Sequence, residues 1–174
     1  MATGIILALV ICAMPLLSAL VIAAGGRGAT KWCDKVGIGA MGVSLLAAIY
    51  MAIGHHEFIG QKWDFEWITV GGHPWRLGIL IDGMTLSLLI VVTLVSFLVH
   101  LFSRKYMQGE VRFHDFFRWI GFFTFSMLVL VISDNLLTLF VAWELMGLSS
   151  YKLIEVILRA DHAAAGLVEQ AVLG

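Results

Sequence analysis

The feature that most limits how this chain can fold is a set of long apolar runs that are almost free of charge. Residues 1–26 carry no charged side chain, and the first basic residue is Arg27. Similar runs follow at 36–54, 83–103, 115–133 and 135–153. About 20 apolar residues suffice for a helix to cross the roughly 30 Å hydrocarbon core of a bilayer. The sequence therefore predicts an all-α polytopic membrane protein with about five transmembrane helices, the first over roughly 3–24.

The overall composition agrees with a membrane location. Of the 174 residues, 60% are hydrophobic and only 13% are charged, about half the charged share of a typical soluble domain. So few charged side chains cannot supply the polar surface of a soluble domain. The formal net charge of −1 excludes a nucleic-acid-binding protein that relies on bulk positive charge. We therefore expect the lipid bilayer as the surrounding medium and no nucleic-acid partner.

The basic residues are divided unevenly between the two sides of the predicted membrane domain. If the helices alternate in direction, one side receives nine basic residues and the other only Lys62 and Arg76. The nine are Arg27, Lys31, Lys35, Arg104, Lys105, Arg112, Arg118, Lys152 and Arg159. Loops rich in Lys and Arg stay in the cytoplasm, so the N-terminus is expected outside and the C-terminus inside. A short outer turn at 133–135 would join the last two helices, with Asp134 or Asn135 capping the fifth helix.

The segment between the second and third runs has the alternation of a β-hairpin. Apolar side chains alternate on either side of a Gly71-Gly72 pair: Trp63, Phe65 and Trp67 before it, and Trp75, Leu77 and Ile79 after it. This pattern predicts two antiparallel strands over 63–81, with these residues on the apolar sides of the hairpin. The distribution of basic residues puts this segment on the outer face, and its aromatic side chains are expected at the membrane–water boundary, where Trp is favoured. The chain then divides into two helices and the start of the outer loop (1–62), the hairpin (63–81), three helices (82–154) and a short amphipathic tail (155–174).

Glu144 is the candidate site residue that the sequence marks most clearly. It lies ten residues after Asp134, so it is about 15 Å into the fifth helix and near the middle of the hydrocarbon core. An ionised carboxylate at that depth needs a cation or a wet cavity, and a protonated carboxyl is the alternative. Either state makes Glu144 a candidate proton carrier that faces the helix bundle rather than lipid. A neutral Glu that only hydrogen-bonds across a helix interface is the competing, purely structural interpretation.

A stripe of polar residues on the third helix is the second candidate. At 100° per residue, one arc of about 80° holds Asp82, Thr85, Thr93, Ser96, His100 and Ser103. Ser and Thr often pack between membrane helices, which favours a helix–helix seam. A partly hydrated track ending at His100 is the alternative, with His100 as a proton relay because its imidazole titrates near neutral pH. Asp82 is expected to cap the third helix, and proton transfer is its alternative role.

Motifs for redox chemistry are missing from the sequence. It contains no Gly-rich phosphate loop, no CxxC pair, no haem or flavin motif and no nucleophile triad. Cys12 and Cys33 give neither a disulfide framework nor a cysteine metal site. We therefore expect that this chain itself binds no cofactor and no metal.

The stretch 82–154 resembles the N-terminal part of chain 5, the large antiporter-like subunit of respiratory complex I (NADH:quinone oxidoreductase). The matching segments are 82–85, 95–100, 103, 106–107, 125–128, 134–137, 139–140, 143–144, 147–151 and 153–154. In that family such a Glu is paired with a Lys on a later helix and moves protons, coupled to quinone reduction elsewhere in the complex. The resemblance implies that Glu144 is the acid of the proton pathway, and Asp82 and His100 match further motif positions.

The same resemblance implies the partners and the location of the chain. It implies the other membrane subunits of complex I as partners, with NADH and quinone used elsewhere in the complex. It also implies a bacterial plasma membrane or an equivalent energy-coupling membrane. Mrp-type cation/proton antiporters and inorganic-carbon uptake subunits share the signature, so a transporter without NADH chemistry is an alternative function. Residues 155–174 do not resemble the next segment of the family, so a non-catalytic truncated fragment is a further alternative.

Overall fold

The structure, a computed structural model, describes residues 3–70, 73–109 and 112–173. Five of its helices are long and apolar enough to cross a membrane, which confirms the predicted fold class. They are α1 (Thr3–Gly25), α2 (Cys33–Ile53), α4 (Gly83–Tyr106), α5 (Phe113–Ile132) and α6 (Leu136–Leu173), with the apolar span of α6 at Leu136–Arg159. Shorter elements lie between them: the 3-10 helix η1 (Gly26–Lys31), helix α3 (His55–Phe58), and strands β1 (Gln61–Val70) and β2 (His73–Ile81).

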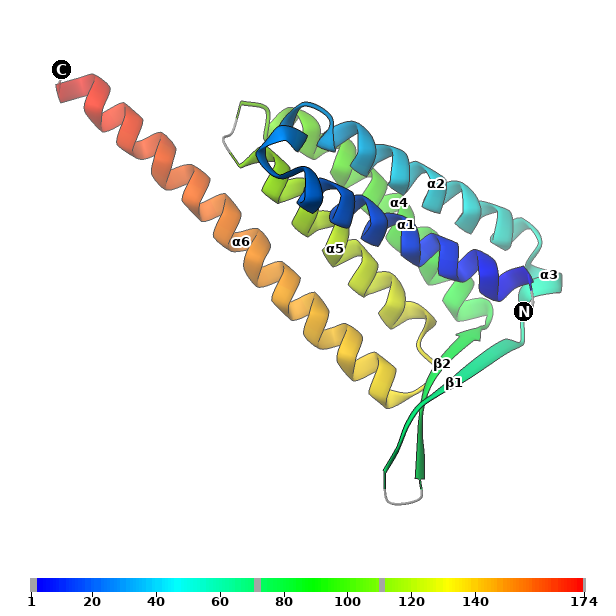
Figure 1. The fold of residues 1–174 in the computed structure, drawn as a ribbon. Helices are drawn as coiled ribbons and strands as arrows, with labels where there is room; N and C mark the ends of the chain where they lie inside the picture. The colour runs from blue at the N-terminus through cyan, green and yellow to red at the C-terminus, as the bar shows by residue number, and fades with distance from the viewer. Residues whose placement is uncertain (1–2, 71–72, 110–111, 174) are drawn as a thin grey trace.

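Four of the long helices form a closed bundle, and the fifth lies against its side. Helix α1 packs against α2 and α5, and α4 also packs against α2 and α5. Helix α6 runs along α5, and the hairpin projects from the end of the bundle at which α4 and α6 begin (Figure 1). The C-terminus lies at the opposite end, beyond the η1 region and the α4–α5 connection (Figure 1).

Two groups of buried apolar side chains hold the bundle together. The group nearer the hairpin includes the fully buried Ile11, Met51 and Leu89. The group nearer the C-terminal end is built around Ile22 and Phe117. Burial of each such side chain contributes roughly 1.5–3 kcal/mol when water is the alternative surrounding. In lipid the close packing of side chains contributes more to the stability of the bundle than the hydrophobic effect does, because the lipid tails are as apolar as the core.

The two strands form the predicted antiparallel hairpin. Trp63 lies opposite Ile79 and Phe65 lies opposite Leu77, so the alternation is in register near the bundle. The register shifts between Glu66 and Ile68, and Ile68 rather than Trp67 lies opposite Trp75. The predicted alternation of Trp63, Phe65 and Trp67 is therefore interrupted before Trp67 can pair, because a bulge adds one residue to β1 and reverses the side-chain order beyond it. The predicted turn residues, 71–72, lie outside the described residues.

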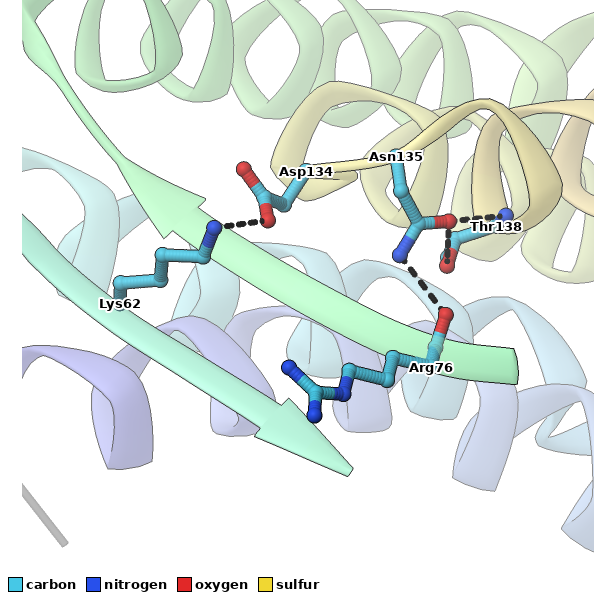
Figure 2. A network of polar contacts seen from close by, with 5 residues as sticks. All are labelled: Lys62, Arg76, Asp134, Asn135 and Thr138. Atoms are coloured by element: carbon cyan, nitrogen blue, oxygen red, sulfur yellow. Dashed lines mark hydrogen bonds and ion pairs between the residues drawn. The ribbon is translucent and has the colours of Figure 1, made fainter. Parts of the chain in front are cut away.

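The hairpin is fixed to the turn between α5 and α6 (Figure 2). The ammonium of Lys62 lies 2.7 Å from a carboxylate oxygen of Asp134, and the backbone N–H of Asp134 donates to the carbonyl of Gly78 at 3.1 Å. A Cβ atom at position 78 would lie 3.0 Å from the Asp134 side chain, so glycine permits this close approach. Asp134 also holds the pKa of Lys62 above its usual value, because the hydrogen bond between the side chains favours the charged ammonium.

Asn135 completes this junction and starts α6. Its side-chain oxygen accepts a hydrogen bond from the backbone N–H of Thr138 at 2.8 Å, and its side-chain amide donates to the carbonyl of Arg76 at 2.8 Å (Figure 2). The predicted cap of the fifth helix is thus Asn135, while Asp134 binds the hairpin. From this cap α6 continues as one helix of 38 residues, with no break at the boundary placed between 154 and 155.

Candidate functional site

Glu144 lies on the face of α6 that points away from α5. The buried residues Ala142, Ser149 and Val156 are spaced by seven and form the seam of α6 toward the bundle. Glu144 follows Ala142 by two residues, about 200° around the helix, and its side chain is exposed. The prediction that Glu144 faces the bundle is therefore wrong, because the seam of small and β-branched residues is the face that packs on α5.

The surroundings of Glu144 form an open strip, here called the α6 outer face. Its members lie within about 60° of Glu144 around the helix and are all exposed. They are Phe140, Gly147, Leu148 and Tyr151. A Cβ atom at position 147 would meet no atom within 4 Å, so no other helix of the structure packs at this point. The strip has room for a further membrane segment in direct contact with the carboxyl.

Two cations in the predicted spans, Lys152 and Arg118, form ion pairs with carboxylates other than Glu144. Lys152 is 2.8 Å from Glu155, and Arg118 is 3.0 Å from Asp115. Across the described residues, no Lys or Arg forms an ion pair with Glu144. If Glu144 is ionised within the membrane, it needs either water or a cation from outside the described part of the chain.

The polar stripe of α4 is enclosed by its neighbours. All of its members within the helix are buried: Thr85, Thr93, Ser96, His100 and Ser103. The hydroxyl of Thr124 on α5 donates to the hydroxyl of Ser96 at 3.3 Å, and Thr93 donates to the carbonyl of Leu89 at 2.6 Å. The stripe is therefore a seam of α4 against the bundle, the first of the two interpretations of its pattern.

His100 is the one ionisable group in this seam, and it is fully buried. Its Nδ1 lies 2.8 Å from the carbonyl oxygen of Ser96, so Nδ1 carries the proton and donates it to that oxygen. Its Nε2 is also buried and has no hydrogen-bond partner in the described part of the chain. Phe117 meets the ring edge-on, with a centroid distance of 5.9 Å. An unpaired buried nitrogen is costly, and such an atom can take up a proton if water or another group reaches it.

Gly37 on α2 gives the imidazole its space. A Cβ atom at this position would lie 3.2 Å from Cδ2 of His100 and 3.1 Å from Cδ1 of Phe117. Both distances are shorter than most contacts between carbon atoms in a packed core. Any side chain larger than that of glycine would press on the ring. The sequence did not point to Gly37, because only the packing of α2 against α4 reveals what it touches.

Asp82 has the geometry of a helix cap. Its carboxylate accepts a hydrogen bond from the backbone N–H of Thr85 at 2.7 Å, at the first turn of α4. This bond holds the pKa of Asp82 below its usual value, because it favours the ionised carboxylate. Asp82 precedes His100 by 18 positions, or about 27 Å along the helix. The structure thus separates Asp82, His100 and Glu144 instead of gathering them into one site.

One charged pair near His100 was not anticipated from the sequence. Arg104, one turn after His100 on α4, places its Nε 2.9 Å from a carboxylate oxygen of Asp34, which lies in the first turn of α2. The two residues are 70 positions apart, so no local pattern could have linked them. Across the described residues, His, Cys, Asp and Glu side chains form no group of three that could hold a metal ion.

The chain is similar to subunits of respiratory complex I. Residues 67–117 match the family model described as the chain 5 N-terminus of NADH-ubiquinone oxidoreductase (complex I). NADH-quinone oxidoreductase subunit L of Neisseria meningitidis serogroup B is 37% identical over 151 residues, which cover 84% of this chain and 22% of the relative. The subunit of the same name from Escherichia coli K12 is 35% identical, over 81% of this chain and 24% of the relative. NADH-ubiquinone oxidoreductase chain 5 of Chondrus crispus is 37% identical, over 84% and 22%.

A solved structure shares the fold. A chain of the membrane-bound sulfane sulfur reductase, an archaeal respiratory membrane complex, superposes with a TM-score of 0.66 at 20% identity. The match covers 84% of this chain and 29% of that chain. The chain is thus similar, over most of its own length, to the N-terminal part of complex I chain 5, which confirms the resemblance found in the motifs. It spans about a quarter of the length of the curated relatives it matches.

Proposed function

We propose that this chain forms the first part of a proton-translocating membrane subunit of an NADH:quinone oxidoreductase. The observation that carries the proposal is the 37% identity to subunit L of Neisseria meningitidis over 84% of the chain. The five apolar helices fit a multi-pass subunit of such a complex. Its partners are the other membrane subunits of complex I, and NADH and quinone react in other subunits. This chain binds neither of them.

Glu144 is the proton carrier in this proposal. The α6 outer face leaves the carboxyl open to a membrane segment that packs there, and a Lys from that segment would favour the ionised form. When the cation moves away, the carboxyl takes up a proton because an unpaired charge in the membrane is expensive. Alternation between these two states moves one proton in each cycle. The exposure of Glu144 supports this role, because a carboxyl sealed inside α1–α5 could not meet a cation from another segment.

His100 is the proposed relay on the other side of α5. Its unpaired Nε2 can accept a proton, and the Asp34–Arg104 ion pair lies one turn further toward the end of the bundle. Asp82 acts as a helix cap in this proposal and carries no proton. We place His100 on a path toward the membrane surface rather than beside Glu144.

The proposed orientation has the N-terminus and the hairpin outside and the C-terminus in the cytoplasm of a bacterium or an equivalent compartment. Each of the two cations on the hairpin, Lys62 and Arg76, forms an ion pair with a carboxylate. The other nine basic residues follow the positive-inside distribution for a bacterial plasma membrane or an equivalent energy-coupling membrane. A cysteine at position 64 should react with an impermeant label from outside, and one at position 108 should react only from inside. The reverse labelling would contradict this orientation.

The decisive experiment for function compares Glu144→Gln with Glu66→Gln in membranes of the host. Gln keeps the shape and hydrogen bonding of Glu but cannot release a proton. We expect the tagged chain to copurify with NADH-oxidising subunits in both variants, and proton pumping per NADH oxidised to fall at least tenfold only in Glu144→Gln. Wild-type pumping in Glu144→Gln would refute the carrier role. Copurification with a cation/proton antiporter or a carbon-uptake complex, without NADH-oxidising subunits, would refute the assignment to complex I.

A further inference from the structure

A pocket of about 600 Å³ lies among residues of η1, the start of α2, the end of α4 and the start of α5, at the end of the bundle opposite the hairpin. Its lining is formed by Thr30, Lys31, Asp34, Arg104, Lys105, Gln108, Gly109 and Phe113. The volume is within the range of about 300–1,000 Å³ that is usual for small-molecule sites. The proton-carrier proposal for Glu144 makes no use of this pocket.

The pocket carries an excess of positive charge. Lys31, Arg104 and Lys105 line it together with a single carboxylate, that of Asp34. Neither lysine forms an ion pair with a carboxylate in the described part of the chain, whereas both cations of the hairpin do. An anion that entered the pocket would therefore meet positive charge that this end of the bundle leaves unbalanced.

Arg104 is oriented for such an anion. Its contact with Asp34 uses Nε, and the carboxylate of Asp34 is largely buried. A guanidinium has five N–H donors, and even a bidentate contact with one carboxylate uses only two of them, so at least three remain available. The side chain of Arg104 is 56% exposed and lines the pocket, so an anion in the pocket can reach it. Asp34 thus holds the guanidinium in position without consuming its capacity to bind a phosphate group.

The surface next to the pocket is apolar and exposed. Leu101 and Phe102 lie four and three residues before Lys105, respectively, so they share its face of α4, one turn deeper in the membrane. Phe102 stacks on Tyr106 with a centroid distance of 5.8 Å, and both rings are exposed. A cationic pocket at the level of the helix ends, next to an apolar strip within the membrane, matches the shape of a phospholipid.

We infer that this pocket binds the headgroup of an anionic phospholipid. Arg104, Lys31 and Lys105 donate hydrogen bonds to the phosphate and to a second anionic or hydroxyl group of the head, and an acyl chain lies along Leu101 and Phe102. The apolar strip favours a lipid over a soluble phosphate ion, because an acyl chain can pack on the strip whereas a phosphate ion makes no apolar contact. This site depends only on the geometry of the pocket, so it stands or falls independently of the role of Glu144.

The test measures lipid binding by the purified full chain, using native mass spectrometry after exchange into bilayer discs. The discs contain phosphatidylcholine alone or with phosphatidylglycerol. We expect phosphatidylglycerol to be retained and phosphatidylcholine to be lost. The Lys31→Ala/Lys105→Ala variant, which keeps the Asp34–Arg104 pair, should bind about 30-fold more weakly, since each lysine near the surface contributes roughly 1 kcal/mol, or about fivefold. Lys35→Ala is the matched control, because Lys35 is exposed at the same end but does not line the pocket.

Three results would overturn the inference. Equal retention of both lipids would show that the pocket does not select an anionic head. An equal loss in Lys35→Ala would show that general surface charge, rather than the pocket, attracts the lipid. Displacement of phosphatidylglycerol by millimolar inorganic phosphate would identify a soluble anion as the ligand. Circular dichroism of each variant confirms that the helices are intact, so that weaker binding is attributed to the site.

Discussion

Helices α4 and α6 both carry an ionisable residue within an apolar span, but α4 is buried in the bundle to a much larger extent than α6. In the most apolar stretch of α4, 39% of the residues are buried, against 11% in α6. His100 on α4 is enclosed by α2 and α5, whereas Glu144 on α6 is exposed on the side away from α5. A polar residue within a span can therefore belong to a completed interface or to an unoccupied one. The surroundings of His100 are formed by helices of this chain, whereas those of Glu144 depend on the segment or solvent that contacts the exposed face of α6.

The strongest test of this comparison truncates both side chains. His100→Ala should lower the free energy of unfolding by about 2–3 kcal/mol, because it leaves a cavity between Gly37 and Phe117. Glu144→Ala should change it by no more than about 0.5 kcal/mol, because the side chain makes no contact that packing depends on. Titration of the purified chain with a denaturing detergent measures both values. Equal losses would show that α6 is packed as tightly as α4.

The next largest effect is expected from adding a side chain where helices meet. Gly37→Leu should destabilise the chain by about 1–3 kcal/mol, because the new atoms press on His100 and Phe117. Gly147→Leu on α6 should be neutral or slightly stabilising in the isolated chain, because its Cβ meets nothing and leucine favours helix over glycine. Thermal unfolding in detergent would compare the two. Gly39→Leu, on α2 but with open space around it, is the control for a change in helix propensity alone.

The smallest effect is expected at the caps of the two helices. Asn135→Ala should cost about 1–2 kcal/mol and Asp82→Ala about 1 kcal/mol, since Asn135 also binds the hairpin while Asp82 binds only the first turn of α4. The two caps should also differ in their response to pH. The folded pKa of Asp82 is lowered, so its contribution is present above the unfolded value of roughly 3.9 and is lost as the pH falls through the folded value.

The amide of Asn135 does not titrate, so its contribution should persist at acidic pH. Unfolding measured between pH 7 and pH 3 in wild type and Asp82→Asn separates the two caps. Asn keeps the acceptor of the cap but removes its titration, so the variant should lose less stability on acidification than wild type does. An identical acid response in both proteins would show that Asp82 is not the group responsible.

Much of this architecture could be predicted from the sequence, because a segment that spans a bilayer must satisfy its own backbone hydrogen bonds and can do so as an apolar helix. The charge-poor runs located four of the five spans to within about three residues of the helix ends, and the start but not the end of α6. The alternation around 71–72 located the hairpin. The cap on α6 could be narrowed to Asp134 or Asn135, since either side chain suits that position. Each of these features is local, so spacing along the chain contains the information that determines it.

The features that were not predicted depend on which segments meet. The depth of Glu144 followed from counting residues, but the direction of its side chain did not. The seam of α6 contains the small residues Ala142 and Ser149, while large apolar residues such as Phe140 and Leu148 are exposed, so hydrophobicity does not mark the buried face. The Asp34–Arg104 pair required the packing of α2 on α4. The bulge in β1 was hidden because the alternation from Trp63 to Trp67 has no visible interruption. Periodicity identifies a face, and only packing shows which face is covered.

The cap at Asn135 has a mechanical consequence for the long helix that follows it. A helix of 38 residues is about 57 Å long, and Glu144 lies only about 12 Å from its first residue. The turn and the hairpin hold the capped end, so this end acts as the fulcrum of a lever. For a tilt about that point, displacement grows in proportion to distance, and the far end moves almost five times as far as Glu144. A tilt of about 5° would move the far end by about 5 Å and the carboxyl by only about 1 Å, less than half the length of a hydrogen bond.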